Sequence, residues 1–121
     1  MSTQAVNPTL ADFISQLSTD VEKVSFEQVM RVISENYRYT AATFTNGDLL
    51  NEAGTNEGSC KIFYFAQLNK LTEQQTLACF GRFYRDDVVN NPQGNDHGNI
   101  RNFIQSGWQA IQFKSVALTT L

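Results

Sequence analysis

A polar loop followed by an apolar helix carries many of the side chains in this chain that could do chemistry. Four residues of the loop have amide or acid groups that could face a ligand: Asn51, Glu52, Asn56 and Glu57. Cys60 stands where the helix is expected to begin, and His97 is the only histidine of the chain. We expect the loop to form the floor of a site.

Cys60 and His97 could act as a nucleophile and its general base. A thiol at a helix N-terminus feels the positive end of the helix dipole, which lowers its pKa, and a nearby histidine can accept its proton. Asp96, Asn99 or Asn102 could orient the imidazole ring. The competing interpretation is that Cys60 is a small core residue and His97 a polar residue in the first turn of a helix, because free cysteine is among the most buried residue types. A cysteine-dependent enzyme is therefore the alternative function.

A metal site would need the acids and the single histidine: Glu52, Glu57, Asp96 and His97. Their spacing matches none of the known patterns, since HExxH, paired CxxC and the EF-hand loop are all missing. The sequence thus predicts neither a metal nor a cofactor. We expect these acids to cap helices or to pair with arginines.

A binding pocket for a small anion is the third possibility. Arg85 and Arg101 could supply paired donors for a carboxylate or a phosphate. Apolar walls would come from Tyr64, Tyr84 and Trp108. The whole predicted ligand-binding set is Asn51, Glu52, Asn56, Glu57, Tyr84, Arg85, Asp96, Asn99 and Arg101. In the structural alternative, Arg85 and Arg101 only pair with nearby acids and close loops.

Composition bounds the class of protein. The chain has 121 residues, of which 41% are hydrophobic and 12% aromatic, enough for the core of one domain. A net charge of -3 and a pI near 5.0 argue against binding to nucleic acid or to an anionic membrane surface. The sequence has neither an apolar run of about 20 residues nor a secretory signal, so we expect a cytosolic protein with Cys60 and Cys79 as free thiols.

Helical spacing predicts most of the elements. Asn7 and Pro8 are expected to start a first helix, and Ser25 with Gln28 forms a capping box before a helix over 26–37. Ser59 is expected to cap a helix over 60–70 that is apolar on nearly every side and therefore central. Thr72 and Gln75 form a second capping box, which opens a helix that reaches Val88.

The remaining elements follow from turn signals and alternation. Asn46 and Gly47 favour a type I′ turn, with Thr43–Thr45 pairing to Asp48–Leu50. Asp96 is expected to cap a helix that ends at Ser106 and Gly107. Residues 108–113 alternate like a strand that pairs with the hairpin, and 116–118 could add another. The expected fold is α+β: a mostly helical single domain (about five helices) with a small antiparallel β-sheet and a flexible segment at 1–8.

Several motifs in order resemble the HopJ type III effector family. They are Asn51-Glu52-Ala53-Gly54, Asn56-Glu57-Gly58-Ser59-Cys60-Lys61-Ile62-Phe63, Thr76-Leu77-Ala78-Cys79-Phe80-Gly81, Tyr84-Arg85-Asp86 and Asp96-His97-Gly98-Asn99-Ile100-Arg101-Asn102-Phe103. The resemblance spans about Leu10 to Leu118. It implies a small protein of the bacterial cytoplasm that a type III system can secrete toward a host protein, and it implies no particular reaction. The polar first nine residues are compatible with such export.

Overall fold

The computed structural model describes residues 9–121. The expected cap at Asn7 and Pro8 and the expected flexible segment 1–8 lie outside the described residues. Within residues 9–121 the chain has five α-helices, two small antiparallel sheets and three short turns of other helix types. The prediction of a mostly helical α+β fold is confirmed.

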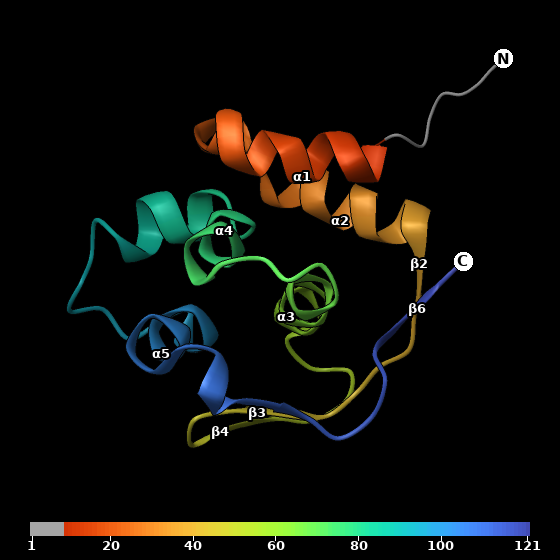
Figure 1. Cartoon of the computed structure of the whole chain (residues 1–121). Helices are drawn as coiled ribbons and strands as arrows, with labels where there is room; N and C mark the ends of the chain where they lie inside the picture. Colours follow the sequence, from red (N-terminus) through yellow and green to blue (C-terminus); the bar gives the residue numbers. More distant parts are fainter. Residues whose placement is uncertain (1–8) are drawn as a thin grey trace, which may run out of the picture.

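Helix α3 (Glu57–Leu68) is the central element, as its composition predicted. Figure 1 shows it end-on in the middle, with α1 (Thr9–Thr19) and α2 (Phe26–Asn36) paired above it and the strands β3 (Phe44–Asn46) and β4 (Leu49–Asn51) below. Its buried residues are Cys60, Ile62, Phe63, Phe65 and Ala66. The ring of Phe63 packs against four aromatic rings, with centroids 5.1 to 6.3 Å away, on Phe44, Phe80, Phe103 and Trp108.

The start of α2 follows the prediction in part. Ser25 Oγ accepts a hydrogen bond from the backbone N–H of Gln28 at 3.1 Å, which caps the helix. The side chain of Gln28 is used differently, because its Nε2 donates to Gln16 Oε1 at 2.8 Å and joins α2 to α1. A 3₁₀ turn, η1 (Val21–Lys23), connects the two helices.

The predicted helix from Thr72 to Val88 is broken into two. The capping box of Thr72 and Gln75 opens α4 (Glu73–Ala78), and a π-helical segment, η2 (Phe83–Val88), follows. Gly81 lies between them at φ 59, a left-handed conformation that glycine adopts readily. A Cβ at Gly81 would come within 2.7 Å of the backbone nitrogen of Phe26, so the break lets this corner lie directly against the start of α2.

The three-stranded sheet is antiparallel and has the order β4-β3-β5, where β5 is Ile111–Phe113. Strands β3 (Phe44–Asn46) and β4 (Leu49–Asn51) form the predicted hairpin, but Asn46 belongs to the strand and pairs with Leu49. The two-residue turn is therefore Gly47-Asp48, with Gly47 at φ 66, and the predicted Asn46-Gly47 turn is wrong by one residue. The reason is tertiary: Asn46 is fully buried and its Nδ2 donates to the backbone oxygen of Asn99 in α5 (Gly98–Ser106).

The C-terminal segments pair with earlier strands. Residues 108–113 begin as a 3₁₀ turn, η3 (Gly107–Ala110), and only β5 (Ile111–Phe113) is a strand, which pairs with β3 as expected. Strand β6 (Leu118–Thr120) pairs with β2 (Tyr37–Tyr39), so the predicted strand at 116–118 starts later than expected. Helix α5 (Gly98–Ser106) ends at Gly107 as predicted, and its Ile104 side chain is exposed.

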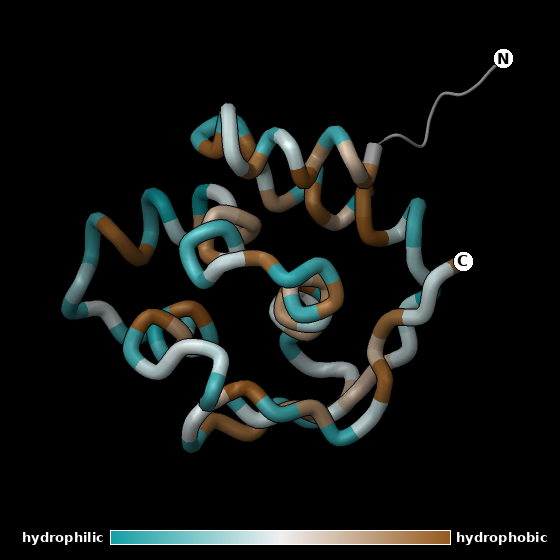
Figure 2. The backbone as a smooth tube through the Cα atoms, viewed as in Figure 1, coloured by the Kyte–Doolittle hydropathy of each residue, from teal (hydrophilic) through white to brown (hydrophobic). Residues whose placement is uncertain are grey.

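The loop between η2 and α5 is hydrophilic over most of its length. Figure 2 shows it on the left of the molecule largely in teal and white, while brown segments lie in the helices and strands. None of the helices in residues 9–121 has both the length and the apolar character needed to cross a bilayer.

Candidate functional site between the starts of two helices

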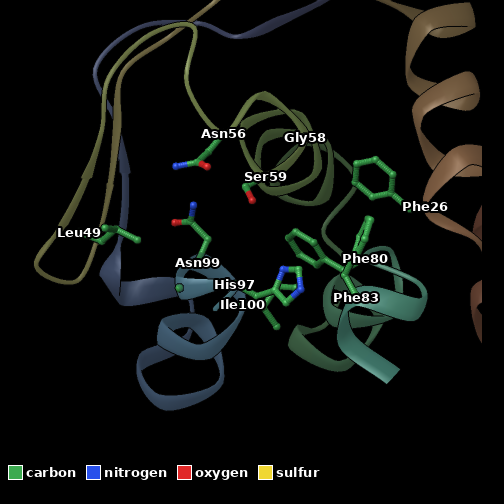
Figure 3. A pocket seen from close by; sticks show the side chains of 11 residues that line it. Phe26, Leu49, Asn56, Gly58, Ser59, Phe80, Phe83, His97, Asn99 and Ile100 are labelled. Carbon is green, nitrogen blue, oxygen red and sulfur yellow. The ribbon is translucent and has the colours of Figure 1, made fainter. Parts of the chain in front are cut away.

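A cavity of about 470 Å³ lies between the first turns of α3 and α5. Figure 3 shows its two polar sides, with Asn56 and Ser59 at the start of α3 and His97 and Asn99 at the start of α5. Gly58 of α3 and Gly98 and Ile100 of α5 also line it. The other lining residues are aromatic or aliphatic and come from α2, β4, η2 and the segment before η2: Phe26, Leu49, Phe83 and Phe80. We call this space the α3/α5 cavity.

Both helices begin in the same way. The residue before each helix, Asn56 for α3 and His97 for α5, is left-handed, with φ 49 and φ 53. Neither side chain caps its own helix. The first backbone bonds run from Cys60 N to Asn56 O at 3.0 Å and from Arg101 N to His97 O at 3.1 Å.

The backbone N–H groups that precede these first bonds in the chain have no carbonyl acceptor in their own helix. They belong to residues 57–59 in α3 and 98–100 in α5, and Gly58, Ser59, Gly98, Asn99 and Ile100 are all on the cavity wall. Helix N-termini also carry the positive end of the helix dipole. The polar side of the cavity is therefore suited to an anion.

A network of buried asparagines fixes the two helix starts against the sheet. Asn99 Nδ2 donates to Asn51 Oδ1 at 2.8 Å, and Asn56 Nδ2 donates to the same oxygen at 2.7 Å. Asn46 Nδ2 donates to the backbone oxygen of Asn99 at 2.8 Å. Asn46, Asn51 and Asn99 are buried, so these bonds replace those that water would make.

His97 is the one ionisable side chain on the cavity wall. Its Nε2 lies 3.0 Å from Oδ2 of Asp87 on η2, and 3.9 Å from Oδ2 of Asp96. Asp96 is held by Arg101, whose Nη2 donates to Asp96 Oδ1 at 2.7 Å. The imidazole ring lies 5.4 Å from the ring of Phe83, centroid to centroid.

The remaining wall of the cavity is apolar. Phe26 and Phe83 meet edge to face, with centroids 5.1 Å apart and an interplanar angle of 74°. A Cβ on Gly58 would come within 2.7 Å of Cζ of Phe26, so this glycine lets the Phe26 ring approach the start of α3. The cavity thus combines an aromatic wall with a polar one.

Comparison with known proteins places the chain in a family. The family model for the HopJ type III effector protein matches residues 10–118. This chain belongs to the HopJ type III effector family. The resemblance that the sequence motifs suggested is confirmed, and a bacterial origin follows from the family.

One solved structure closely resembles this HopJ protein. It is a crystal structure of VPA0580, described as a protein of unknown function, with 54% sequence identity, a TM-score of 0.91 and 93% of each chain covered. Comparison with proteins of curated function gives no match. The fold is therefore shared with a relative that is itself described as a protein of unknown function.

The HopJ fold brings only part of the predicted site together. Asn56, Asn99 and His97 line the α3/α5 cavity, and Asn51 lies directly behind it in the asparagine network. Glu52 and Glu57 are exposed beside the loop, and Glu57 Oε2 accepts a hydrogen bond from the hydroxyl of Tyr39 at 3.0 Å.

The structure does not bring the two arginines to this cavity. Arg85 Nη2 donates to the backbone oxygen of Val24 at 2.8 Å. Arg101 closes the loop before α5, with donors to Asp96 and to the backbone oxygen of Asn91. Arg101 and Tyr84 line a second cavity of about 300 Å³ between η2 and α5.

Two of the expected aromatic walls are also elsewhere. Tyr64 packs on Phe113 with centroids 4.9 Å apart, and Trp108 packs on Phe103 with centroids 4.9 Å apart. Asp96 does not cap α5 as expected, because the chain turns at His97 and Asp96 bonds to Arg101 instead.

Cys60 lies away from the wall that His97 occupies. It is 1% exposed, its Sγ lies 3.7 Å from the backbone oxygen of Ala42, and it does not line the α3/α5 cavity. Burial raises the pKa of the Cys60 thiol, so the expected lowering of this pKa is wrong. Cys79 is fully buried, and burial raises its pKa to about 12.

The metal set considered from the sequence is likewise not assembled. Across residues 9–121, no three or more His, Cys, Asp and Glu side chains are grouped closely enough to hold a metal ion. Glu52, Glu57, Asp96 and His97 therefore do not form a common coordination site in the described part of the chain.

Sequence reasoning missed several residues of the cavity. Phe26, Phe80 and Phe83 were not among the predicted site residues, and Ser59 was expected only as a helix cap. No local pattern marked Asp87 as a site residue, because its partner His97 lies ten positions later, on the far side of a loop. The glycine in Asn56-Glu57-Gly58-Ser59 was the one available hint, since glycine permits close approach of other groups.

Proposed function

We propose that this HopJ protein works by binding a small molecule that has an anionic group and an apolar body, and that the α3/α5 cavity is its site. The observation that carries the proposal is the two-sided cavity of about 470 Å³, whose volume lies within the range of sites for small molecules. One side is polar and the other aromatic. A ligand with two matching ends would use both.

The polar side supports an anionic end group. The first turns of α3 and α5 both contribute lining residues with N–H groups that precede the first helical hydrogen bond. The Ser59 hydroxyl and the His97 ring add two further polar groups. The carboxylates of Asp87 and Asp96 lie 3.0 and 3.9 Å from Nε2 of His97, and neither residue lines the cavity.

The aromatic side supports an apolar body of limited size. Phe26, Phe80 and Phe83 offer ring surface, and Leu49 and Ile100 extend it. Burying about 100 Å² of apolar ligand surface would contribute about 2.5 kcal/mol. Such a contribution is enough to prefer an aromatic acid over a bare inorganic anion.

Benzoate is a suitable first probe, with benzamide as a neutral compound of the same shape and benzylamine as a cation. The measurement is the change in backbone amide chemical shifts during a titration followed by two-dimensional NMR. We expect the amide chemical shifts of Gly58, Ser59, Gly98 and Asn99 to change as benzoate is added and to reach a plateau when the site is saturated. Benzamide and benzylamine should shift them far less.

The proposal fails if benzoate leaves the chemical shifts of these amides unchanged. It also fails if the three probes cause similar shift changes at residues scattered over the surface. Arg101 provides a control, because its guanidinium belongs to the second cavity. Perturbation centred on residues of that cavity would point to the arginine site that the sequence suggested, and would reject the α3/α5 cavity.

We also propose that the protein is secreted by a type III system and meets its small ligand or a host protein after delivery. The support is the family description alone. A reporter enzyme fused after the HopJ chain should be translocated by a bacterium with an intact secretion system. Equal translocation by a strain without that system would overturn this proposal and leave the binding proposal untouched.

A further inference from the structure

His97 and Asp87 form a pair that the binding function does not require. Nε2 of His97 and Oδ2 of Asp87 are 3.0 Å apart, and the histidine side chain is only 27% exposed. A carboxylate can only accept hydrogen bonds, so Nε2 carries the hydrogen and donates it. The neutral ring then has its lone pair on Nδ1, which forms no hydrogen bond with any residue in 9–121.

The arrangement resembles the way a general base is prepared in many enzymes. A carboxylate that holds one ring nitrogen fixes both the tautomer and the orientation of the imidazole. The ring of Phe83, 5.4 Å away, packs beside it and restricts its rotation. The left-handed backbone at His97, with φ 53, places the side chain at the very start of α5 and on the cavity wall.

Ser59 faces this pair across the α3/α5 cavity. Figure 3 shows its hydroxyl directed from α3 into the space that separates it from His97 and Asn99. No hydrogen bond joins Ser59 to another side chain in the described residues, and none joins it to His97. The gap between the two polar walls is where a ligand and a water molecule would sit.

We propose that the α3/α5 cavity hydrolyses a small carboxylic ester, with a water molecule as nucleophile and His97 as its general base. The inference rests on the proposed function, because it uses the same cavity and its acid product is an anion with an apolar body. Asp87 acts as a positioning residue for the ring. Ser59 and the backbone N–H groups at the start of α3 stabilise the oxyanion.

The reaction balances with water as the only co-reactant. Nδ1 of His97 takes a proton as the water oxygen bonds to the ester carbonyl carbon, and the carbonyl oxygen becomes an oxyanion held by the Ser59 hydroxyl. The intermediate collapses, the bond from carbon to the alkoxy oxygen breaks, and His97 returns its proton to the leaving alcohol. The products are a carboxylic acid, ionised near neutral pH, and an alcohol.

The substrate para-nitrophenyl benzoate tests this directly, because its acid product is the benzoate used as a binding probe. The release of para-nitrophenol by the full chain is followed by absorbance. His97→Asn is the first variant, since asparagine tolerates the left-handed conformation at this position. We expect a rate loss of about a hundredfold or more, the usual contribution of a general base.

Two further variants separate chemistry from folding. Asp87→Asn should lower the rate by about a hundredfold, because the His97 ring loses its fixed tautomer. Asp86→Asn, on the same turn but exposed, should leave the rate unchanged. In Asp87→Asn the loss should fall on kcat rather than on KM, whereas a collapse of the cavity would raise KM.

Ser59→Ala should lower the rate by about a hundredfold through loss of an oxyanion donor, and Ser106→Ala serves as its control.

The outcomes distinguish this inference from the proposed function. If benzoate shifts the cavity amides but the wild-type rate does not exceed that of His97→Asn, the hydrolytic role is overturned and the binding role stands. A rate that depends on His97 but is equal in Asp87→Asn and Asp86→Asn overturns the role of Asp87. Both proposals fall if benzoate does not bind and if wild type hydrolyses para-nitrophenyl benzoate no faster than His97→Asn does.

Discussion

Asn51 and Asn99 form a reciprocal pair of side-chain hydrogen bonds between β4 and the first turn of α5. Nδ2 of Asn99 donates to Oδ1 of Asn51 at 2.8 Å, and Nδ2 of Asn51 donates to Oδ1 of Asn99 at 3.1 Å. Asn56, just before α3, donates to the same Asn51 oxygen. One buried amide therefore links the starts of both helices that form the polar side of the α3/α5 cavity.

Replacing Asn51 with alanine should lower the free energy of unfolding by about 2–3 kcal/mol. The change removes the four side-chain hydrogen bonds of Asn51 and leaves the buried Nδ2 of Asn99 without a partner, at a cost of about 1–3 kcal/mol before relaxation. Denaturation by urea measures the loss. Asn90→Ala, at an exposed position, is the control and should change the unfolding free energy by less than about 0.5 kcal/mol.

The same variant should also weaken binding of benzoate, because the two helix starts would no longer be held in register. A variant that is destabilised as expected but binds benzoate as well as wild type would show that the network serves stability alone.

The two thiols should be unreactive in the folded protein. Cys60 and Cys79 are 1% and 0% exposed, and burial raises the pKa of both thiols, that of Cys79 to about 12. Because the thiolate is the reactive form, iodoacetamide near neutral pH should modify neither residue until a denaturant is added. Mass spectrometry after timed labelling gives the measurement, and rapid modification of native Cys60 would restore the cysteine-dependent mechanism.

Much of this fold could be predicted because the helices bury apolar residues at regular spacing. Val29 and Ile33 in α2 follow that spacing, and the nearly all-apolar run from Ile62 to Ala66 marked α3 as the centre. The capping box at Thr72 and Gln75 was visible because both partners lie within one turn. Local patterns of this kind need no knowledge of the rest of the chain.

The errors have tertiary causes. The start of α3 was placed too late because Asn56 takes a left-handed conformation, and its side chain bonds to Asn51 in the sheet. The break at Gly81 follows from the close passage of the backbone at Phe26, which no local pattern reveals. The predicted Asp96 cap is wrong because the Asp96 carboxylate accepts a hydrogen bond from Arg101 instead.

The candidate site was harder to predict for the same reason. Asn56, Asn99 and His97 could be chosen from their chemistry, yet the arginines expected beside them bond to backbone oxygens elsewhere. The cavity also depends on Phe26 and Phe83, which come from α2 and η2 and meet only in the folded chain. Residue type alone does not separate such rings from ordinary core residues.

The pair of Asp96 and Arg101 should make stability depend on acid pH. The hydrogen bond from Arg101 holds the pKa of Asp96 below its usual value. A carboxyl whose pKa is depressed by folding contributes stability above its unfolded pKa and loses that contribution as the pH falls through its folded pKa. The melting temperature of Asp96→Asn should therefore lie below that of wild type near neutral pH, and the two should converge at acid pH below the folded pKa.

A double-mutant cycle tests whether Arg101 is the cause. In an Arg101→Gln background, Asp96→Asn should have little further effect on the melting temperature at any pH. A pH-dependent difference that persists without Arg101 would assign the effect to another neighbour of Asp96, of which His97 is the nearest candidate, with its Nε2 3.9 Å from Oδ2.

Gly58→Ala should disturb the aromatic wall of the α3/α5 cavity while leaving the fold intact. The new methyl group would lie 2.7 Å from Cζ of Phe26, the free end of that side chain, so the ring must move toward the cavity or away from it. Gly58 is not in the left-handed region, so alanine can adopt its backbone conformation, and alanine is a better helix former than glycine. We expect nearly unchanged stability and about tenfold weaker binding of benzoate, equal to about 1.4 kcal/mol.

Gly98→Ala is the matched change on the opposite wall. Its methyl group would lie 3.4 Å from Cδ2 of Leu49, an ordinary contact, so no aromatic ring has to shift. Benzoate binding by Gly98→Ala should therefore stay closer to wild type than binding by Gly58→Ala. Equal binding by both variants and wild type would mean that the Phe26 ring is not part of the ligand site, whereas equal and large losses would place the critical contact at the helix starts themselves.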